Sequence, residues 1–204
     1  CRKKLWHVLM MLPPKIAIAS GNEGKIREIS LMFHGLDIEF VSQQKLGLSE
    51  AEEPYDTFLE NALTKARHVS KNSGLPALAD DSGICVSALD GRPGVRSARF
   101  AGEDAIDVQN NNHLIELMRS AIDRRAHYYC ALVLVRHYND PAPLIADGRW
   151  FGEVLHEPRG QGGFGYDPLF LDLSLQLTGA EMSLVQKNEI SHRGAAVRSM
   201  RLLL

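Results

Sequence analysis

Two adjacent carboxylates stand between apolar segments near the middle of the chain. Asp80 and Asp81 precede Ser82-Gly83 and separate Ala77–Ala79 from Ile84–Leu89, which are both predicted to be short strands. Paired carboxylates at the ends of buried strands are costly unless they bind a cation, meet lysines or transfer protons. Mg²⁺ suits such a pair, because it takes oxygen ligands and is usually held by one or two carboxylates plus substrate phosphates. An ordinary Asp-Ser-Gly turn is the alternative.

Further carboxylates precede a predicted helix. Glu52 and Glu53, with Asp56 and Glu60 close behind them, could contribute to a metal site. A solvated acidic loop is the alternative, because negative charge just ahead of a helix interacts favourably with the helix dipole.

A third segment is suited to binding phosphate, because it joins a predicted strand, Lys15–Ser20, to a predicted helix, Lys25–Phe33. Glycines in such a turn let backbone N–H groups approach an anion, the helix N-terminus favours negative charge, and a lysine adds a positive charge. The spacing is not that of a Walker loop, and a plain turn with a surface lysine would have the same composition. The segment consists of Ser20, Gly21, Asn22, Glu23, Gly24 and Lys25.

Two later segments could bind a base. In Gly162–Pro168, Phe164 and Tyr166 lie among glycines, and such rings can stack on a purine or instead plug the core. Ser191–Gly194 (SHRG) offers donors at a helix start, suited to a phosphate or a carbonyl oxygen, although a capped surface helix is the alternative. Together the segments supply phosphate donors, metal-type carboxylates and a stacking loop. That combination indicates a Mg²⁺-dependent nucleotide enzyme.

The elements that must position these segments alternate between strand and helix early in the chain. The helix after Thr57 has the clearest limits, because Thr57 and Glu60 form a capping box and Gly74 ends the helix. Ser191 is the expected N-cap of the last helix. The pattern predicts an α/β fold with a mixed sheet. The other expected elements are strands at Asp37–Ser42, His127–His137 and Leu144–Val154 and helices at Asp104–Ile122, Ala180–Glu189 and His192–Leu204.

The composition limits the class of protein. The 204 residues include 23 basic and 25 acidic side chains, so the net charge is −2, and the small charge disfavours nucleic-acid and membrane partners. The length favours one domain at residues 15–204, after a loose N-terminal extension at residues 1–14. The apolar run Leu5–Leu12 is far shorter than the about 20 residues of a membrane span. Three widely separated cysteines fit a reducing compartment, so a cytoplasmic protein is expected.

In this order, the motifs resemble those of the inosine triphosphate pyrophosphatases, which hydrolyse non-standard purine nucleoside triphosphates. The bacterial dITP/XTP pyrophosphatase branch is the most similar. The resemblance extends from about Lys15 to the C-terminus. It rests on Ser20–Lys25 (SGNEGK), Glu52-Glu53, Thr57–Lys65 (TFLENALTK), Ala79–Gly83 (ADDSG), Gly91–Ala105 (GRPGVRSARFAGEDA), Gly162–Phe170 (GGFGYDPLF) and Ser191–Gly194 (SHRG).

The resemblance implies a role for each matched residue. Asp81 would be the catalytic base and a metal-site residue, and Glu52, in preference to Glu53, would supply another Mg²⁺ ligand. The family fold is an elongated mixed sheet between two helical lobes with a central cleft, usually as a homodimer. The triphosphate would be held by Ser20–Lys25, Lys65, Ser82 and Lys187, and the base by Phe164, Gly165, Tyr166, Asp167, His192 and Arg193.

The expected reaction is Mg²⁺-assisted hydrolysis of ITP, dITP or XTP to the monophosphate and pyrophosphate. Mg²⁺ and the lysines would neutralise the leaving pyrophosphate, and Asp81 would orient or deprotonate the attacking water. A donor such as Arg193 would favour a purine with a 6-keto oxygen over one with a 6-amino group. The alternatives are a Mg²⁺-dependent pyrophosphatase of other modified nucleotides, such as pyrimidines, and a catalytically silent nucleotide-binding regulator.

Overall fold

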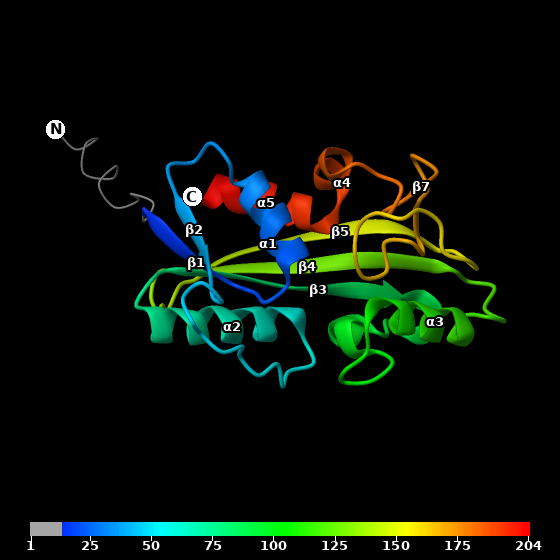
Figure 1. Ribbon diagram of the computed structural model, residues 1–204, viewed down its shortest axis with the longest axis horizontal. Helices are drawn as coiled ribbons and strands as arrows, with labels where there is room; N and C mark the ends of the chain where they lie inside the picture. Colours follow the sequence, from blue (N-terminus) through cyan, green and yellow to red (C-terminus); the bar gives the residue numbers. More distant parts are fainter. Residues whose placement is uncertain (1–13) are drawn as a thin grey trace.

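One mixed sheet organises the molecule. The computed structural model describes residues 14–204, and seven strands among them pair in the order β2-β1-β3-β4-β5-β6-β7 (Figure 1). Strand β1 (Lys15–Ala19) is parallel to β2 (Glu39–Ser42) and to β3 (Ala77–Val86), and the later pairings are antiparallel. The expected mixed α/β sheet is therefore confirmed. The expected N-terminal extension lies, except for its last residue, outside the described residues.

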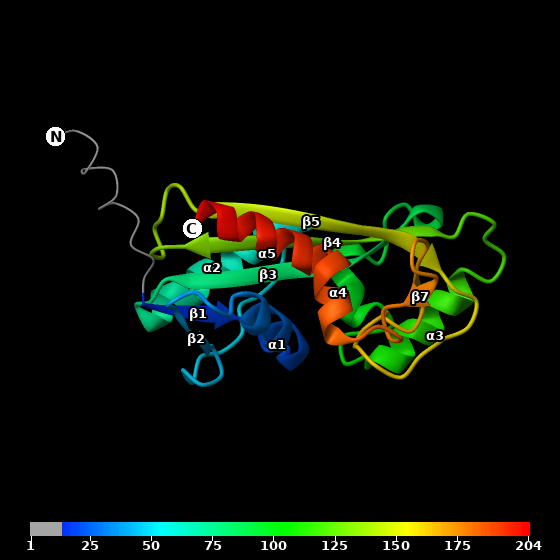
Figure 2. The ribbon, with the colours of Figure 1, turned by 90° about the horizontal axis from the view of Figure 1, so that it is seen from above.

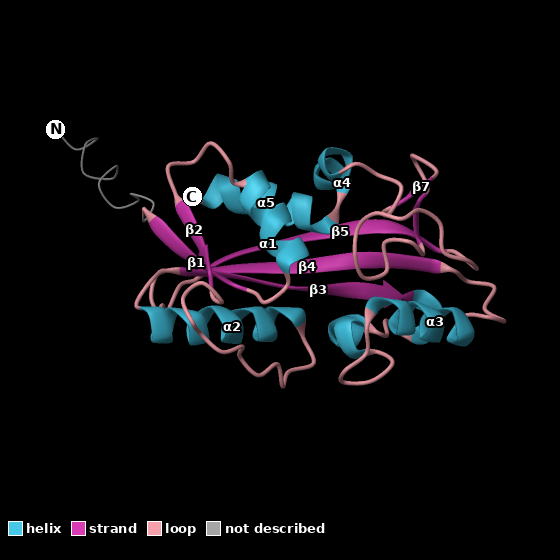
Figure 3. Cartoon of the chain, viewed as in Figure 1, coloured by secondary structure: helices cyan, strands magenta, loops and turns pink. Residues whose placement is uncertain are grey.

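Helices cover both faces of the sheet. Helices α1, α4 and α5 lie on one side and α2 and α3 on the other (Figure 3), and the molecule is elongated along β4 and β5 (Figure 2). In the described part of the chain, no helix has the length and apolar character needed to cross a membrane. The remaining strands are β4 (Arg125–Val135), β5 (Leu144–Val154), β6 (Phe170–Asp172) and β7 (Leu177–Thr178). The α-helices are α1 (Glu23–Met32), α2 (Phe58–Ser73), α3 (Asp107–Leu117), α4 (Leu184–Ile190) and α5 (His192–Leu203). Two short 3₁₀ helices are η1 (Ser87–Leu89) and η2 (Gly94–Arg99).

Helix α2 packs on the sheet through small side chains. Ala62 and Ala66 of α2 are fully buried against the sheet, together with Val69. Because alanine has only a methyl group, the helix lies close to the strands beneath it. The sheet residues of this cluster alternate along the strands, so they share one face, and they are Ala17, Ala19, Ala77, Ala79, Ala131, Val133 and Val135.

Strand β3 differs from the expectation. Residues Asp80–Gly83 do not form a turn between two short strands, because Ala77–Val86 is one strand that pairs with β4 along its whole length. The carboxylates are tolerated inside the strand because each meets a cation, Asp80 on one face and Asp81 on the other. The pairing of β1 with β3 ends at Ala79, so on that side β3 has no strand partner from Asp80 to Ile84, before an isolated bridge joins Cys85 to Pro93. The two carboxylates therefore lie where the sheet opens.

The remaining boundaries follow the local signals. Thr57 caps α2 through Glu60 N at 3.3 Å, and Gly74 ends the helix with φ +71°, as expected. Ser191 caps α5, and the limits of β5 match the prediction. The helix expected at residues 104–122 is shorter, and η1, η2, β6 and β7 were not predicted. These four elements are too short to leave a periodic pattern.

Candidate active site

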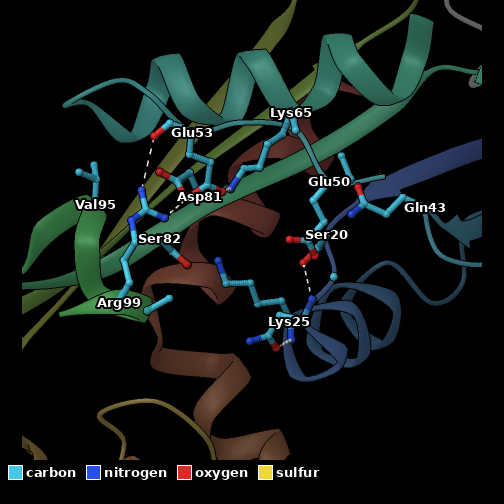
Figure 4. A pocket seen from close by; sticks show the side chains of 15 residues that line it. Ser20, Lys25, Gln43, Glu50, Glu53, Lys65, Asp81, Ser82, Val95 and Arg99 are labelled. Carbon is cyan, nitrogen blue, oxygen red and sulfur yellow. Dashed lines mark hydrogen bonds and ion pairs between the residues drawn. The ribbon is translucent and has the colours of Figure 1, made fainter. Parts of the chain in front are cut away.

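A polar cavity of about 300 Å³ lies where the edge of β3 is unpaired (Figure 4). The turn between β1 and α1 forms one wall, and the acidic loop with α2 forms the opposite wall. Segments that are far apart in the sequence thus meet at this cavity. We call it the first pocket, and its polar lining consists of Ser20, Gly21, Asn22, Lys25, Gln43, Glu50, Glu53, Lys65, Asp81, Ser82 and Arg99.

The β1–α1 turn is held by its own side chains and by a neighbour. The Asn22 side chain accepts a hydrogen bond from Lys25 N at 3.0 Å and so caps α1, and Ser20 Oγ accepts one from Asn22 N at 3.2 Å. Gln44 Nε2 donates to the carbonyl oxygen of Gly21 at 2.8 Å. A Cβ at Gly21 would lie 1.8 Å from a Glu50 carboxylate oxygen, so a side chain there would displace the Glu50 carboxylate. The capped N-terminus of α1 therefore borders the first pocket.

Not every residue of the SGNEGK segment contacts this pocket. Ser20, Gly21, Asn22 and Lys25 line it, whereas Glu23 is exposed in the first turn of α1 and lines neither this pocket nor the one described below. Gly24 packs instead under the ring of Phe164, since a Cβ at Gly24 would lie 2.8 Å from Phe164 Cδ1.

One lysine joins the two carboxylates of the first pocket. Lys65 Nζ lies 2.7 Å from Glu53 Oε1 and 2.9 Å from Asp81 Oδ1. Burial raises the pKa of Asp81, and the nearby Lys65 only partly offsets that effect. Burial acts in the same direction on Glu53, but Lys65, Lys25 and Arg99 outweigh it and lower its pKa. The surroundings therefore shift the pKa values of the two carboxylates in opposite directions.

The carboxylates fit a divalent cation that also binds phosphate. Asp81 Oδ2 is buried and has no hydrogen-bond partner among the described residues, so it is free to accept a ligand. Within those residues no three His, Cys, Asp or Glu side chains gather as a metal site. Mg²⁺ does not need three, because one or two carboxylates with substrate phosphates commonly suffice. Glu53 and Asp81 fit that description.

Glu52 and Glu53 line different depressions in the structure. Glu53 lines the first pocket and is bound to Lys65, while Glu52 is exposed and lines a neighbouring depression, which shares Glu50 with the first pocket and also contains Tyr55 and His68. The two neighbouring side chains point to different sides of the loop. A sequence alone does not reveal which of two adjacent loop residues faces inwards.

A second pocket of about 100 Å³ adjoins the first and shares Asn22, Lys25 and Ser82 with it. Because the lining residues are shared, the two pockets form one cleft. Lys187 lies in the second pocket and not in the first. The residues of the second pocket that the sequence had indicated are Phe164, Gly165, Tyr166, Asp167, Lys187, His192 and Arg193.

The floor of the second pocket is a buried network of ion pairs. Arg193, 1% exposed, donates to Asp80 at 2.9 Å, to Glu28 at 2.5 Å and to Ser82 Oγ at 2.7 Å. Lys187 Nζ bridges Glu28 at 3.0 Å and Asp167 at 2.5 Å. Most N–H groups of the Arg193 guanidinium are therefore bound to protein side chains.

Asp80 links this network to the first pocket, because its Oδ1 lies 2.8 Å from Lys25 Nζ. Burial alone would raise the pKa of Asp80, but Arg193 and Lys25 hold it well below its usual range. Sequence analysis assigned no role to Glu28, to Arg99 or to Asp80 by itself. Glu28 lies three residues after Lys25, so helical spacing could have placed both on one side of α1.

The aromatic residues have separate functions in the cleft. The rings of His192 and Tyr128 are stacked at 4.6 Å with an angle of 7°, and burial lowers the pKa of His192 well below its usual range, so the imidazole is neutral. Tyr166 belongs to the core, and its hydroxyl donates to Ser97 O at 2.9 Å. Phe164 borders the cleft, with Lys187 Nζ 4.5 Å from its ring centre. Of the two loop aromatics, only Phe164 is placed to stack on a ligand.

Comparisons with known proteins agree with this geometry. The model of the Ham1 family matches residues 16–202. A protein of Nitrosomonas europaea named dITP/XTP pyrophosphatase is 58% identical over 90% of each chain, and one of the same name from Burkholderia pseudomallei is 53% identical over 91% of each. The structure of a HAM1 protein from Coxiella burnetii has a TM-score of 0.86 at 45% identity and covers 95% of this chain and 98% of its own. The Staphylococcus aureus Ham1 protein has a TM-score of 0.82 at 35% identity, with 93% and 97% covered. By sequence and by structure, the chain belongs to the Ham1 family.

Proposed function

We propose that the protein hydrolyses non-standard purine nucleoside triphosphates, namely ITP, dITP and XTP, to the monophosphate and pyrophosphate. The observation that carries the proposal is the continuity of the two pockets, which puts a small, aromatic-bordered recess next to a polar pocket that holds three cationic side chains and a buried carboxylate. The names of the relatives from Nitrosomonas and Burkholderia agree with this activity.

In this proposal the first pocket holds the triphosphate. Lys25, Lys65 and Arg99 supply three positive charges, but Glu50, Glu53 and Asp81 supply three negative ones. Such a pocket needs an added cation before it can hold a polyanion. Glu53 and Asp81 would hold Mg²⁺, which when bound would neutralise charge on the phosphates and on the leaving pyrophosphate.

Asp81 acts on the attacking water. Its pKa is raised by burial, which makes it a better proton acceptor than an exposed aspartate. Lys65, bound to Asp81 Oδ1, keeps the carboxylate in one orientation and leaves Oδ2 for other ligands. Lys65 also provides positive charge where phosphate negative charge develops.

The second pocket selects the base in this proposal. Phe164 stacks on the purine, and Lys187 and Arg193 line the same pocket. Lys187 has three N–H groups and two carboxylate partners, and Arg193 Nη1 has two N–H groups and one carboxylate partner among the described residues. Each side chain therefore keeps one donor for a ligand. Donors favour a 6-keto oxygen over the 6-amino group of adenine.

A substrate panel tests the function. The full chain is assayed in Mg²⁺ for pyrophosphate release from ITP, dITP, XTP, ATP, dATP and a set of modified pyrimidine triphosphates. We expect the first three to have kcat/KM values higher by orders of magnitude than those of the adenine nucleotides. A preference for a pyrimidine would support the alternative substrate class. Binding of ITP without any turnover would support a silent regulator instead.

We also propose that the protein is a cytoplasmic homodimer. The proposal rests on the family resemblance and, for the compartment, on Cys85 and Cys130, which are free thiols. Sedimentation equilibrium should give twice the chain mass of 22.6 kDa, and a mass of one chain at micromolar concentration would contradict the dimer.

A further inference from the structure

One glycine of the base-side loop is held by both of its backbone polar groups. Gly165 N donates to Asp107 Oδ2 at 2.6 Å, and Asn111 Nδ2 donates to Gly165 O at 2.9 Å. Asp107 and Asn111 are four residues apart on α3, so they project from the same side of the helix. Together they clamp a single residue of a loop that lies more than fifty positions away in the sequence.

The same stretch of loop is fixed at two further points. The buried hydroxyl of Tyr166 donates to Ser97 O of η2 at 2.9 Å, and Phe164 N donates to Asp167 Oδ2 at 2.9 Å. Gly165 has φ +61°, in the left-handed region that glycine adopts readily. The loop thus makes a tight turn at Gly165, and the segment formed by η2 and α3 holds the outer side of that turn.

The clamped turn carries the ring that borders the cleft. Phe164 directly precedes Gly165, and its ring lies over Lys187 and against Gly24 of the β1–α1 turn. A shift of the peptide between Phe164 and Gly165 would move this ring relative to both neighbours. Asp107 itself borders the second pocket, which places the clamp at the mouth of the recess.

We propose that Asp107 and Asn111 are positioning residues that hold the Phe164–Gly165 peptide, so that the Phe164 ring is set for stacking on a purine. The inference rests on the proposed function in one respect, namely that the second pocket receives the base. The two residues act through the loop, and the phosphate side of the cleft does not depend on them. Loss of the clamp should therefore weaken binding of the base and leave binding of pyrophosphate unchanged.

The test compares ligands that occupy different parts of the cleft. Asp107→Ala and Asn111→Ala are each prepared in the full chain, and binding of IMP and of inorganic pyrophosphate with Mg²⁺ is measured by calorimetry. One lost hydrogen bond should raise the Kd of IMP by about threefold to tenfold. The Kd of pyrophosphate should stay within about twofold of that of the unaltered chain, which we take as no effect. This is expected because pyrophosphate binds on the other side of the cleft from Asp107 and Asn111. In turnover of ITP, KM should rise while kcat changes little.

A conservative substitution at Asp107 and substitutions at neighbouring exposed residues distinguish a positioning role from a general effect on folding. Asp107→Asn keeps an oxygen that can accept from Gly165 N, so it should restore most of the IMP affinity. Asn112→Ala and Asp104→Ala alter exposed residues that make no side-chain hydrogen bond in the described part of the chain, and they should match the unaltered protein. Thermal unfolding of each variant checks that the fold persists.

The outcomes distinguish this inference from the proposed function. Unchanged IMP affinity in both Ala variants would overturn the clamp, whatever the substrate panel shows. Equal weakening of IMP and pyrophosphate would also overturn it, because that result indicates a general loss of structure. Selective weakening of IMP in a protein that does not turn over ITP would support the clamp and refute the hydrolase.

Discussion

Replacing Arg193 by alanine should destabilise the protein strongly, because Arg193 neutralises two buried carboxylates. Glu28 and Asp80 are 2% and 1% exposed. After the substitution, among the cations of residues 14–204, Glu28 keeps Lys187, at 3.0 Å, and Asp80 keeps Lys25, at 2.8 Å. Removing one partner from a buried ion pair typically costs about 3–5 kcal/mol. For a chain of this size, that corresponds to a fall in Tm of about 6–20 °C.

The stability lost in Arg193→Ala should be smaller at acid pH than at alkaline pH. In the unaltered protein the pKa of Asp80 lies well below its ordinary value of 3.8, because Arg193 and Lys25 outweigh the effect of burial. Ionised Asp80 therefore contributes stability above pH 4, and that contribution is lost only as the pH falls through the lower folded value. Without Arg193, burial raises the folded pKa of Asp80. Protonation of Asp80 at acid pH then removes the unpaired buried charge in the variant. The difference in Tm between the unaltered protein and Arg193→Ala should therefore be smaller at pH 5 than at pH 8.

Urea and thermal denaturation at the two pH values measure this effect. Arg198→Ala is the control, because Arg198 lies on the same helix, is exposed and, within the described residues, its side chain donates a single hydrogen bond, to Asn188 O at 3.1 Å. It should cost no more than about 1 kcal/mol. A loss of unfolding free energy below about 1 kcal/mol for Arg193→Ala at pH 8 would refute the reasoning. Such a small loss would mean that Arg193 does not neutralise buried carboxylates.

The other predictions concern the cleft and its support. Asp81→Asn keeps the shape and removes the charge, so turnover should be abolished while calorimetry still detects nucleotide binding; near-normal kcat would exclude Asp81 as the base. Because burial raises the pKa of Asp81, kcat/KM of the unaltered enzyme should fall on the acid side of a pH profile at a pH above the ordinary aspartate value of 3.8, and a profile flat down to pH 4 would contradict this. Lys25→Ala should weaken pyrophosphate and ITP binding together, and an equal loss of inosine affinity would show that Lys25 does not contact phosphate. Gly148→Ala should lower stability by about 1–3 kcal/mol, because a Cβ there would lie 2.1 Å from His192 O and 2.7 Å from Ala196 N; an unchanged Tm would show that α5 moves away freely.

The elements with strong local signals were predictable from the sequence. Thr57 and Gly74 limit α2 because capping depends on residues within a few positions of the helix end. The continuity of β3 was not predictable. Asp80 and Asp81 look like a turn when only their neighbours are considered, and they are accepted in a strand because Arg193 and Lys65 arrive from distant helices.

In the candidate site, too, some residues were predictable from the sequence and others were not. Residues inside recognisable motifs, such as Lys65 and Asp81, do come together in the first pocket. Glu28 was missed because a glutamate on a helix is usually a surface residue, and only the folded chain reveals that it is buried between two cations. The choice between Glu52 and Glu53 depends on the path of a loop, which has no periodicity that a sequence could reveal.

The alanines beneath α2 have a consequence for the chemistry of the cleft. They set the distance between two layers, and Lys65 projects from one of those layers while Asp81 belongs to the other. A helix raised by larger side chains would carry the ammonium of Lys65 away from the carboxylate, although no residue of the cleft had changed. The spacing between helix α2 and the sheet is thus part of the geometry of the candidate site. Larger side chains at Ala62 or Ala66 should therefore lower the turnover rate more than they lower the stability of the fold.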